Sequence, residues 1–364
     1  MLVIGKGSSG KAAAALAEAQ GRPVEFADGV GLVVASPGVR VMSELEFGCR
    51  ELKKLGVKML AVTGSKGKSS VVKLVADALN LAGLHATPCG NYGLPVSELA
   101  NQLSASNFQH STPAWAVVEV SSFMMETTNL PPGTFEAAAI LNLQEDHLDR
   151  HGSAEAYHAL KLRLIDFAKV GFAPGDARCD TAAVPKGCYF DNDVLRVNGA
   201  YAVALMRTAG LDDTVIERAF REFKPLPHRF QTVAELDGVR YVDDSKATSI
   251  AALVAGVAMS GGKTRLIAGG LPKGDDPKSA LPILTKQVKK VYLIGRCAEE
   301  FRSVWSCAVD CEVCETIDKA VEAARREAEK GDTVLLSPGT ASFDQFKSFG
   351  ERGEVFARLV KKEG

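Results

Sequence analysis

The stretch AVTGSKGKSS, residues 61–70, joins an apolar segment to a glycine-lysine-serine turn that runs straight into a second apolar pattern. Residues 57–62 have the continuous apolar character of a buried strand, and residues 71–81 carry apolar side chains at helical spacing. A turn of this composition between a strand and a helix is typical of a phosphate-binding loop. We therefore expect a nucleoside-triphosphate site here.

Each residue type in the turn suits phosphate chemistry. Gly64 and Gly67 let backbone N–H groups approach phosphate oxygens at the positive end of the helix. Lys68 supplies a cation, and the Ser69 hydroxyl is a ligand for Mg²⁺. The strict pattern has another glycine where this chain has Thr63, so the turn fits only the shortened form G-x-x-G-K-S. The alternative is a glycine-rich turn with a solvated lysine.

The overall composition favours small-molecule partners. At 364 residues the chain is long enough for two or three domains, and its net charge of -1 gives no electrostatic footprint for nucleic acid or an anionic membrane. The sequence opens directly on a strand pattern, and no apolar run is long enough to span a bilayer. We expect a cytoplasmic protein.

The eight cysteines do not indicate a disulfide framework in a chain of this length, and we expect them to be reduced. Cys297, Cys307, Cys311 and Cys314 form a loose cluster with one CxxC pair. Zinc is one interpretation of this cluster. We favour a structural one, because no second CxxC or paired histidine follows and the cysteines alternate with valines as on a strand.

Strand and helix patterns alternate nearly throughout, which predicts an α/β protein with mainly parallel sheets. We expect three domains, at residues 1–45, 46–227 and 228–364. The prolines at residues 225–227 mark the second joint.

The first domain begins as a small Rossmann-like unit. Gly5, Gly7 and Gly10 form a G-x-G-x-x-G turn after a strand at residues 2–4, and Glu25 follows at about the distance of a ribose-binding acid. Dehydrogenases share this turn with proteins that hold the diphosphate of other nucleotide-linked substrates. The second phosphate-binding turn favours the latter.

Two more strand patterns carry polar side chains. Residues 117–123 (VVEVSSF) form an apolar strand interrupted by Glu119, and residues 137–143 lead into His147. Since parallel strands bind ligands at their carboxyl ends, both side chains would lie beside the phosphates. With Ser69 they would make an oxygen-rich Mg²⁺ site with one imidazole. The alternatives are a structural carboxylate and a capping or core histidine.

Together these segments make the chain resemble the Mur ligases over nearly its full length. The matching segments are TGSKGKS (63–69), GNYGLP (90–95), EVSSF (119–123), EDHLDR (145–150), LPHRF (226–230), DDSKAT (243–248), and LSP through DQFKSF (336–349). The last two distinguish the D-glutamate-adding branch of that family. The resemblance implies a small Rossmann-like N-terminal domain, a central P-loop-type ATPase domain with a mainly parallel sheet, and a Rossmann-like C-terminal α/β domain.

The resemblance also implies an activity. The family's D-glutamate-adding members are ATP-dependent acid–D-amino-acid ligases that extend UDP-N-acetylmuramoyl-L-alanine in peptidoglycan precursor synthesis, and so serve cell-wall biogenesis, cell shape and division. ATP phosphorylates the substrate carboxylate, and the acceptor amine attacks the acyl phosphate to give an amide, ADP and phosphate. Electrostatic stabilisation and closure of the C-terminal domain, hinged near residues 225–227, would drive this chemistry. We expect a monomer with no nucleic-acid or membrane partner.

Metal and phosphate roles follow from the same resemblance. Lys68 would neutralise phosphate charge, Ser69 and Glu119 would hold a first Mg²⁺, and His147 a second one with Lys161. Lys161 matches a lysine that the family carbamylates: only a neutral amine captures CO₂, and the resulting anion binds metal where an ammonium would repel it. From the residues alone, Lys161 would be a snorkelling surface lysine.

The remaining substrate contacts are carried over by position. The residues matched to ATP contacts are Gly64, Ser65, Lys66, Gly67, Lys68, Ser69, Ser70, Asn198, His228, Arg229, Asp244 and Lys246. The residues matched to the UDP-linked substrate are Gly7, Ser8, Ser9, Ser36, Pro37, Gly38 and Asn91. The residues matched to D-glutamate are Thr248, Lys273, Ser342 and Phe349, whose lysine and hydroxyl groups suit a dicarboxylate.

The chain departs from the family pattern in three places. Its first domain has about half the usual length, which leaves few side chains for uridine. Its second domain is shortened between about residues 170 and 198, and Lys66 stands where the family usually has asparagine. Two alternatives stay open: another Mur-type or folylpolyglutamate-synthase-like amino acid ligase, or an inactive nucleotide-binding paralogue.

Overall fold

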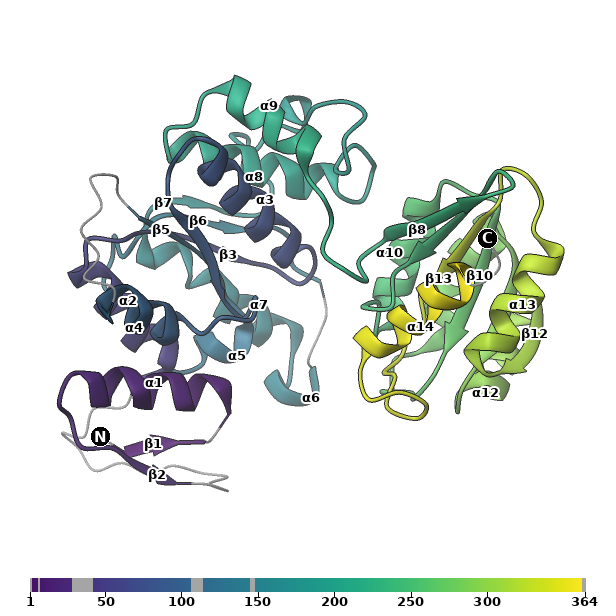
Figure 1. Cartoon of the computed structure of the whole chain (residues 1–364), viewed down its shortest axis with the longest axis horizontal. Coiled ribbons are helices and arrows are strands. Elements are labelled where there is room, and N and C mark those ends of the chain that lie inside the picture. Colours follow the sequence, from purple (N-terminus) through teal and green to yellow (C-terminus); the bar gives the residue numbers. More distant parts are fainter. Residues whose placement is uncertain (1, 6, 28–41, 106–113, 145–147, 362–364) are drawn as a thin grey trace. The chain divides into compact units, whose positions relative to one another are not determined.

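The computed structural model describes residues 2–5, 7–27, 42–105, 114–144 and 148–361 (Figure 1). Contacts divide the chain into two compact units, Met1–Phe223 and Lys224–Gly364. Both units are α/β, with mainly parallel sheets, which confirms the expected fold class. The further division of the first unit into domains at residues 1–45 and 46–227 stays a prediction.

The first unit contains two sheets and the helices around them (Figure 1). Its strands are β1 (Leu2–Ile4), β2 (Glu25–Ala27), β3 (Lys58–Thr63), β4 (Ala86–Gly90), β5 (Trp115–Glu119), β6 (Phe135–Ile140) and β7 (Ala168–Phe172). Its helices are α1 (Ser8–Ala19), α2 (Glu44–Lys54), α3 (Lys68–Leu81), α4 (Val96–Ala105), α5 (Ser122–Met125), α6 (Leu148–His151), α7 (Ala154–Leu162), α8 (Arg196–Thr208) and α9 (Asp213–Glu222), with short 3-10 turns at Ile165–Phe167 and Thr181–Ala183.

Within the described residues, the larger sheet of this unit has the parallel order β4-β5-β3-β6-β7. Helices α2 and α4 cover one face, and α3 and α8 cover the other (Figure 1). The central strand β3 is buried from Met59 to Thr63, because a parallel sheet covered on both faces has no solvated side. Since β3, β5 and β6 are parallel neighbours, the segments that follow them share one edge of the sheet.

The N-terminal segment forms a separate layer in which α1 lies between the pair β1–β2 and helices α2 and α4 (Figure 1). Gly10 makes the glycine turn tight, since a Cβ at this position would come within 2.0 Å of the Gly5 carbonyl oxygen. Glu25 pairs in register with Leu2 at the amino end of β2, away from the turn that follows Ile4. A ribose-binding acid belongs at the carboxyl end of that strand, so the position of Glu25 speaks against a dinucleotide site.

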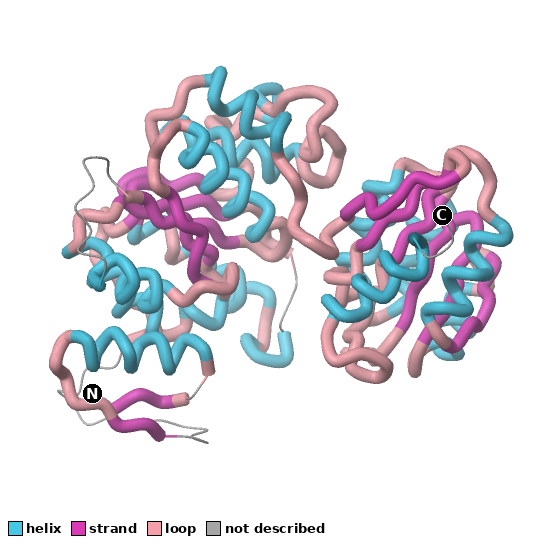
Figure 2. Tube along the Cα trace, in the orientation of Figure 1, coloured by secondary structure: helices cyan, strands magenta, loops and turns pink. Residues whose placement is uncertain are grey.

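The second unit is a sheet between two helical layers, with its strands side by side in Figure 2. Its strands are β8 (Gln231–Leu236), β9 (Val239–Asp243), β10 (Thr264–Gly269), β11 (Val288–Ile294), β12 (Asp310–Glu315) and β13 (Thr333–Leu336). Its helices are α10 (Ile250–Ser260), α11 (Leu281–Gln287), α12 (Ala298–Trp305), α13 (Ile317–Glu327) and α14 (Phe349–Lys361), with a 3-10 turn at Pro277–Ala280. The strand order among described residues is β12-β11-β10-β13-β9-β8, antiparallel only at β8–β9.

Two apolar cores hold this second sheet. Helices α10, α11 and α12 pack on one face, and α13 and α14 pack on the other. Because β9, β13 and β10 are parallel neighbours, the loops that follow them emerge at one edge. These loops carry Lys273 and parts of the DDSKAT and LSP through DQFKSF segments, which include several residues predicted to contact substrates.

All eight cysteines lie in the described part of the chain, and all are free thiols. Cys311 and Cys314 are on β12, as expected, whereas Cys307 precedes that strand and Cys297 caps α12, so the prediction of one strand through the cluster holds only in part. Burial raises the pKa of both strand cysteines to about 11. No three histidine, cysteine or acidic side chains are grouped to hold a metal ion anywhere in the described ranges.

Among the described helices, none combines the length and the apolar character that crossing a membrane requires.

Candidate functional site

The turn at residues 63–69, between β3 and α3, has the geometry of a phosphate loop. Gly64 and Gly67 have φ angles of 147° and 84°, a region that disfavours residues with a Cβ. A Cβ on Gly67 would come within 2.2 Å of the Asn198 amide nitrogen on α8. The loop opens directly onto the N-terminus of α3, so the first N–H groups of that helix face the end where an anion binds.

Lys68 lies folded back over this loop. Its ammonium donates hydrogen bonds to the carbonyl oxygens of Gly64 at 2.8 Å and Ser65 at 3.2 Å. Lys68 is half-buried and the next residue, Ser69, is buried at the start of α3. The loop therefore carries its cation inside the turn. The Lys68 ammonium is thus bonded to the loop and not simply solvated, and its role toward phosphates stays a prediction.

Asn142, two residues after β6, supports the loop and was not singled out in the sequence. Its side-chain amide accepts from the Lys66 N–H at 2.8 Å and donates to the Lys66 carbonyl at 2.9 Å. The same amide donates to the Asn198 side-chain oxygen at 3.2 Å. Its signal in the sequence is only a polar residue at the end of a buried strand.

Glu119 ends β5, next to β3, and is 2% exposed. One carboxylate oxygen accepts from the Asn91 side chain at 2.9 Å, and the other has no hydrogen-bond partner among the described residues. A buried carboxylate oxygen without a partner is costly unless a cation is bound. The chemistry of the site therefore fits Mg²⁺, and the roles of Ser69 and Glu119 as its oxygen ligands stay a prediction. His147, the predicted imidazole ligand, lies outside the described residues.

Lys161 is 1% exposed, so the alternative of a surface lysine is wrong. Its ammonium donates to the Gly64 carbonyl at 3.2 Å and to the Thr63 hydroxyl at 3.4 Å. It also lies 4.6 Å from the ring centroid of Tyr157, whose hydroxyl is 3.3 Å from the Ser65 hydroxyl. Helix α7 thus places Lys161 directly beneath the phosphate loop.

A second group that the sequence analysis missed surrounds His151 at the end of α6. The His151 ring is bonded to the Ser122 hydroxyl at 3.0 Å and stacks on Phe123 with 5.5 Å between centroids. Glu126 lies 3.6 Å from the same ring and is paired with Arg150, whose hydrogen bonds hold the pKa of Glu126 below its ordinary value. These contacts tie the motif after β5 to the segment that carries Lys161.

In the second unit, the predicted acceptor residues come from one edge of the sheet. Thr248 follows β9, Lys273 follows β10 and Ser342 follows β13. The loops after β10 and β13 are joined by two backbone hydrogen bonds between Leu271 and Ala341. Lys273 is exposed, and Ser342 is 2% exposed. Within the part of the chain that the structure describes, no hydrogen bond or ion pair joins these three side chains, so their role as one pocket stays a prediction.

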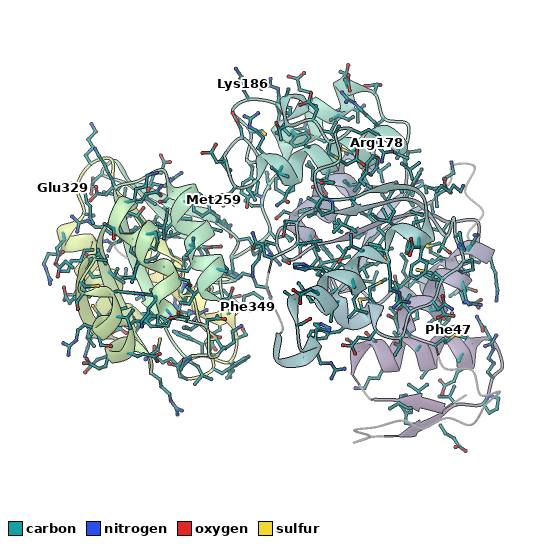
Figure 3. The ribbon with its side chains drawn as sticks, turned by 180° about the vertical axis from the view of Figure 1, so that it is seen from behind. Phe47, Arg178, Lys186, Met259, Glu329 and Phe349 are labelled. Carbon is teal, nitrogen blue, oxygen red and sulfur yellow. The ribbon has the colours of Figure 1, made fainter. Side chains whose placement is uncertain are left out.

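Phe349, labelled in Figure 3, begins α14, and its ring contacts two residues of the same unit that are predicted to bind ATP. The Lys246 ammonium lies 3.9 Å from the Phe349 ring centroid, and the His228 ring lies 6.3 Å from it, edge-on. The His228 Nδ1 atom is 2.7 Å from the buried carboxylate of Asp243, which also accepts from the Ser245 N–H. His228 has a φ of 61°, so this pair holds a strained backbone.

Arg352 is a buried cation behind these loops, 1% exposed. Its guanidinium donates to the Ser245 hydroxyl and carbonyl, both at 2.9 Å, and to the carbonyls of Thr340 and Ala341 at 3.2 and 3.4 Å. All these acceptors are neutral, and burial lowers the pKa of Arg352 to about 10. One side chain therefore joins the loop after β9 to the loop after β13.

Asp244 lies beside the His228 segment and accepts from the Phe230 N–H at 3.1 Å and the Ser337 hydroxyl at 2.9 Å. Burial raises the pKa of Asp244 to about 7, and these two hydrogen bonds oppose the shift. The charge of Arg229, another residue matched to ATP contacts, also stabilises the carboxylate. The two residues thus share one charged environment at this edge.

For the other residues predicted to contact substrates, the structure gives fewer contacts. Gly7, Ser8 and Ser9 lie exposed at the start of α1, and Asn91 touches Glu119. Ser36, Pro37 and Gly38 lie outside the described residues. Asn198 is 5% exposed and contacts the phosphate loop. Binding of the UDP-linked substrate and of adenine at these positions stays a prediction.

Comparison with known proteins gives two family matches and many relatives. The Mur ligase middle domain matches residues 62–178, and the Mur ligase glutamate ligase domain matches residues 228–339. Relatives named UDP-N-acetylmuramoylalanine--D-glutamate ligase include one from Acidobacterium capsulatum, 35% identical over 89% of this chain and 77% of its own length. Another from Rubrobacter xylanophilus is 36% identical over 92% and 86%, and one from Pasteurella multocida is 34% identical over 91% and 82%.

Solved structures share the fold at lower identity. A MurF ligase from Thermotoga maritima in complex with ADP has a TM-score of 0.66 and 16% identity, covering 100% of this chain and 95% of that one. A bifunctional folylpolyglutamate synthase/dihydrofolate synthase from Yersinia pestis has a TM-score of 0.60 and 18% identity, covering 90% and 96%.

Proposed function

This chain belongs to the Mur ligase family, and on that premise we propose that it catalyses the ATP-dependent addition of D-glutamate to UDP-N-acetylmuramoyl-L-alanine, a step of peptidoglycan precursor synthesis. ATP phosphorylates the free carboxylate of the donor. The amine of D-glutamate then attacks the acyl phosphate, which releases phosphate and forms the amide.

The observation that carries the proposal within the structure is Glu119. A buried carboxylate with one oxygen unpartnered, at the strand end next to a phosphate loop, is the environment that a nucleotide-bound divalent cation requires. When bound, Mg²⁺ would neutralise charge on the transferring phosphoryl group. Lys68 would leave the loop carbonyls it now contacts and bind the phosphates, while the N-terminus of α3 holds them in place.

We propose that Lys161 is carbamylated in the active enzyme and, with His147, holds a second Mg²⁺. Support comes from its burial under the phosphate loop, where it lies against Gly64 and Thr63 instead of reaching solvent. The carbamate would replace a cation by an anion at this place, which suits a metal ligand next to phosphates.

The acceptor would bind at the carboxyl edge of the second sheet. Lys273 would pair with a carboxylate of D-glutamate, and the hydroxyls of Thr248 and Ser342 would donate to the acceptor. Arg352 and the Asp243–His228 pair fix the loops on which this set depends. We also propose that the enzyme works in the cytoplasm as a monomer.

The direct test is a coupled measurement of ADP release and product mass with purified protein. We expect ADP release to require both UDP-N-acetylmuramoyl-L-alanine and D-glutamate, and the product to contain one added glutamate. A panel of L-glutamate, L-alanine and diaminopimelate tests the acceptor, and a folate substrate tests the donor. Turnover with another acceptor or with folate would support a different amino acid ligase. An absence of ADP release with both substrates and Mg²⁺ would support an inactive paralogue.

A further inference from the structure

The backbone of the phosphate loop is held from one side by a single amide side chain, that of Asn142. The Lys66 N–H and carbonyl both bond to this amide, at 2.8 and 2.9 Å, as a paired strand residue would. The Ser65 N–H also donates to the Asn142 backbone carbonyl, at 3.0 Å. Two consecutive loop N–H groups are therefore occupied by the segment after β6.

These bonds determine which loop donors remain for an anion. The N–H groups of Ser65 and Lys66 point toward Asn142, so the donors that face a phosphate are those after Lys66, where the chain turns through Gly67 into α3. The Asn142 amide also bonds to the Asn198 side chain. The Asn198 amide nitrogen lies only 2.2 Å from the position that a Cβ on Gly67 would occupy. Asn142 and Asn198 together contact the turn at Lys66 and Gly67.

We propose that Asn142 is a positioning residue for the nucleotide: it fixes the Lys66 peptide so that the N–H groups at the start of α3, and not those of Ser65 and Lys66, bind the phosphates. This inference rests on the proposed ATP-dependent function. Asn142 itself would touch no phosphate. Its effect should therefore appear in nucleotide affinity and leave the affinity for the UDP-linked substrate unchanged.

The chain offers a matched control in Asn80. The Asn80 amide accepts from the Ala86 N–H and donates to the Ala86 carbonyl, both at 2.9 Å, so it makes the same two-bond clamp on another backbone residue. Ala86 begins β4 at the amino edge of the same sheet, opposite to the phosphate loop. Removing either amide costs a comparable set of hydrogen bonds, but only Asn142 contacts the loop.

The test compares Asn142→Ala, Asn142→Asp and Asn80→Ala in the full chain, with ADP and Mg²⁺ as the calorimetric probe. We expect Asn142→Ala to weaken ADP binding about tenfold, because the Lys66 peptide loses its fixed orientation. Asn142→Asp keeps the acceptor for the Lys66 N–H but adds a negative charge beside the phosphates, so it should weaken binding more, by about a hundredfold. Asn80→Ala should lower the melting temperature and leave ADP affinity within twofold.

ADP affinity of either Asn142 variant within twofold of the wild type would overturn the inference, whatever its melting temperature. Asn142→Asp is nearly isosteric, and it decides the question if Asn142→Ala does not fold. The proposed function fails separately: a wild-type protein that binds ADP but forms no product would contradict the ligase and leave the Asn142 comparison readable.

Discussion

The phosphate loop of the first unit and the acceptor-side loops of the second unit are held by different chemistry. Neutral amides hold the phosphate loop at Lys66 and Gly67, through Asn142 and Asn198, while the ammonium groups of Lys68 and Lys161 contact its Gly64 carbonyl. A buried guanidinium and a buried carboxylate support the acceptor-side loops, through Arg352 and Asp243. Both sets of loops follow neighbouring parallel strands, so the difference does not come from the topology.

The difference is the one we expect from what each edge is proposed to bind. A triphosphate with its metal brings large charges of both signs, and the neutral amides at Lys66 and Gly67 do not compete with them. Glu119 keeps one oxygen unpartnered there, which favours a cation. An amino acid dicarboxylate is small and anionic, and a buried Arg352 with only neutral acceptors supplies positive potential behind its loops. The predictions below test this contrast, from the largest effect on activity to the smallest.

Glu119→Gln should have the largest effect on catalysis. We expect turnover to fall about 1,000-fold, because the proposed metal ligand is replaced by a neutral amide of the same shape. The melting temperature should stay unchanged or rise, since a buried charge with an unpartnered oxygen is removed. Steady-state ADP release and thermal unfolding measure the two effects. Glu136→Gln, which changes a carboxylate paired with Lys169, is the control. A variant that loses stability and activity together would make Glu119 a structural carboxylate.

Lys161→Ala should lower turnover about 100-fold, because it removes the proposed second metal ligand beneath the phosphate loop. Added short carboxylates such as formate or acetate should restore part of the activity by taking the place of the carbamate. The readout is the rate of ADP release as a function of carboxylate concentration. Activity that does not respond to carboxylate would leave Lys161 as a buried lysine that only supports Gly64.

Arg352→Met should act on the acceptor edge. We expect the KM for D-glutamate to rise about tenfold and the free energy of unfolding to fall by about 3 kcal/mol, because Ser245, Thr340 and Ala341 lose their buried donor. Initial-rate kinetics and urea denaturation give these two values. Arg358→Met, an exposed arginine on the same helix, should change neither appreciably. An unchanged KM for D-glutamate in the Arg352 variant would remove the contrast between the two edges.

Asp244 gives the stability of the second unit a pH dependence. Its pKa is about 7 in the folded chain against an ordinary value of 3.8, so the folded state binds its proton more tightly. Its contribution to stability is fully present below about pH 4, is lost as the pH rises to about 7, and then stays constant. The total loss is about 4 kcal/mol.

Asp244→Asn should remove this part of the pH profile, as measured by urea denaturation between pH 4.5 and 8. Asp237→Asn, at an exposed turn position with a φ of 53° that asparagine tolerates, should keep it. Identical profiles for the wild type and Asp244→Asn would show that this carboxyl titrates normally.

The sequence predicts those parts of the fold and site that depend on local pattern. The strand and helix around Gly64–Ser69, and the buried carboxylate of Glu119, follow from apolar runs and turn residues and are confirmed. Residues whose contacts depend on which strands are neighbours in the sheet carry no such signal in the sequence. Asn142 reaches the phosphate loop because β6 lies next to β3, and Arg352 joins two loops because β9 lies next to β13.

Lys161 shows the limit most clearly. Its helix resembles a surface helix in sequence, and only the packing of α7 beneath the phosphate loop buries the lysine. The family resemblance predicts a functional role for Lys161, whereas helical spacing alone predicts a lysine on the surface. The positions of Ser36–Gly38 and His147 lie outside the described residues, so their roles rest on the resemblance.

The most direct test of the central claim follows an oxygen atom. UDP-N-acetylmuramoyl-L-alanine labelled with ¹⁸O in its free carboxylate is incubated with ATP, Mg²⁺ and D-glutamate, and the released phosphate is analysed by mass spectrometry. If the reaction passes through an acyl phosphate, each amide formed releases one phosphate that carries one labelled oxygen when both carboxylate oxygens are labelled. When only one carboxylate oxygen is labelled, half of the phosphate carries the label. Phosphate without label, while amide and ADP are formed, would contradict activation of the carboxylate by this site.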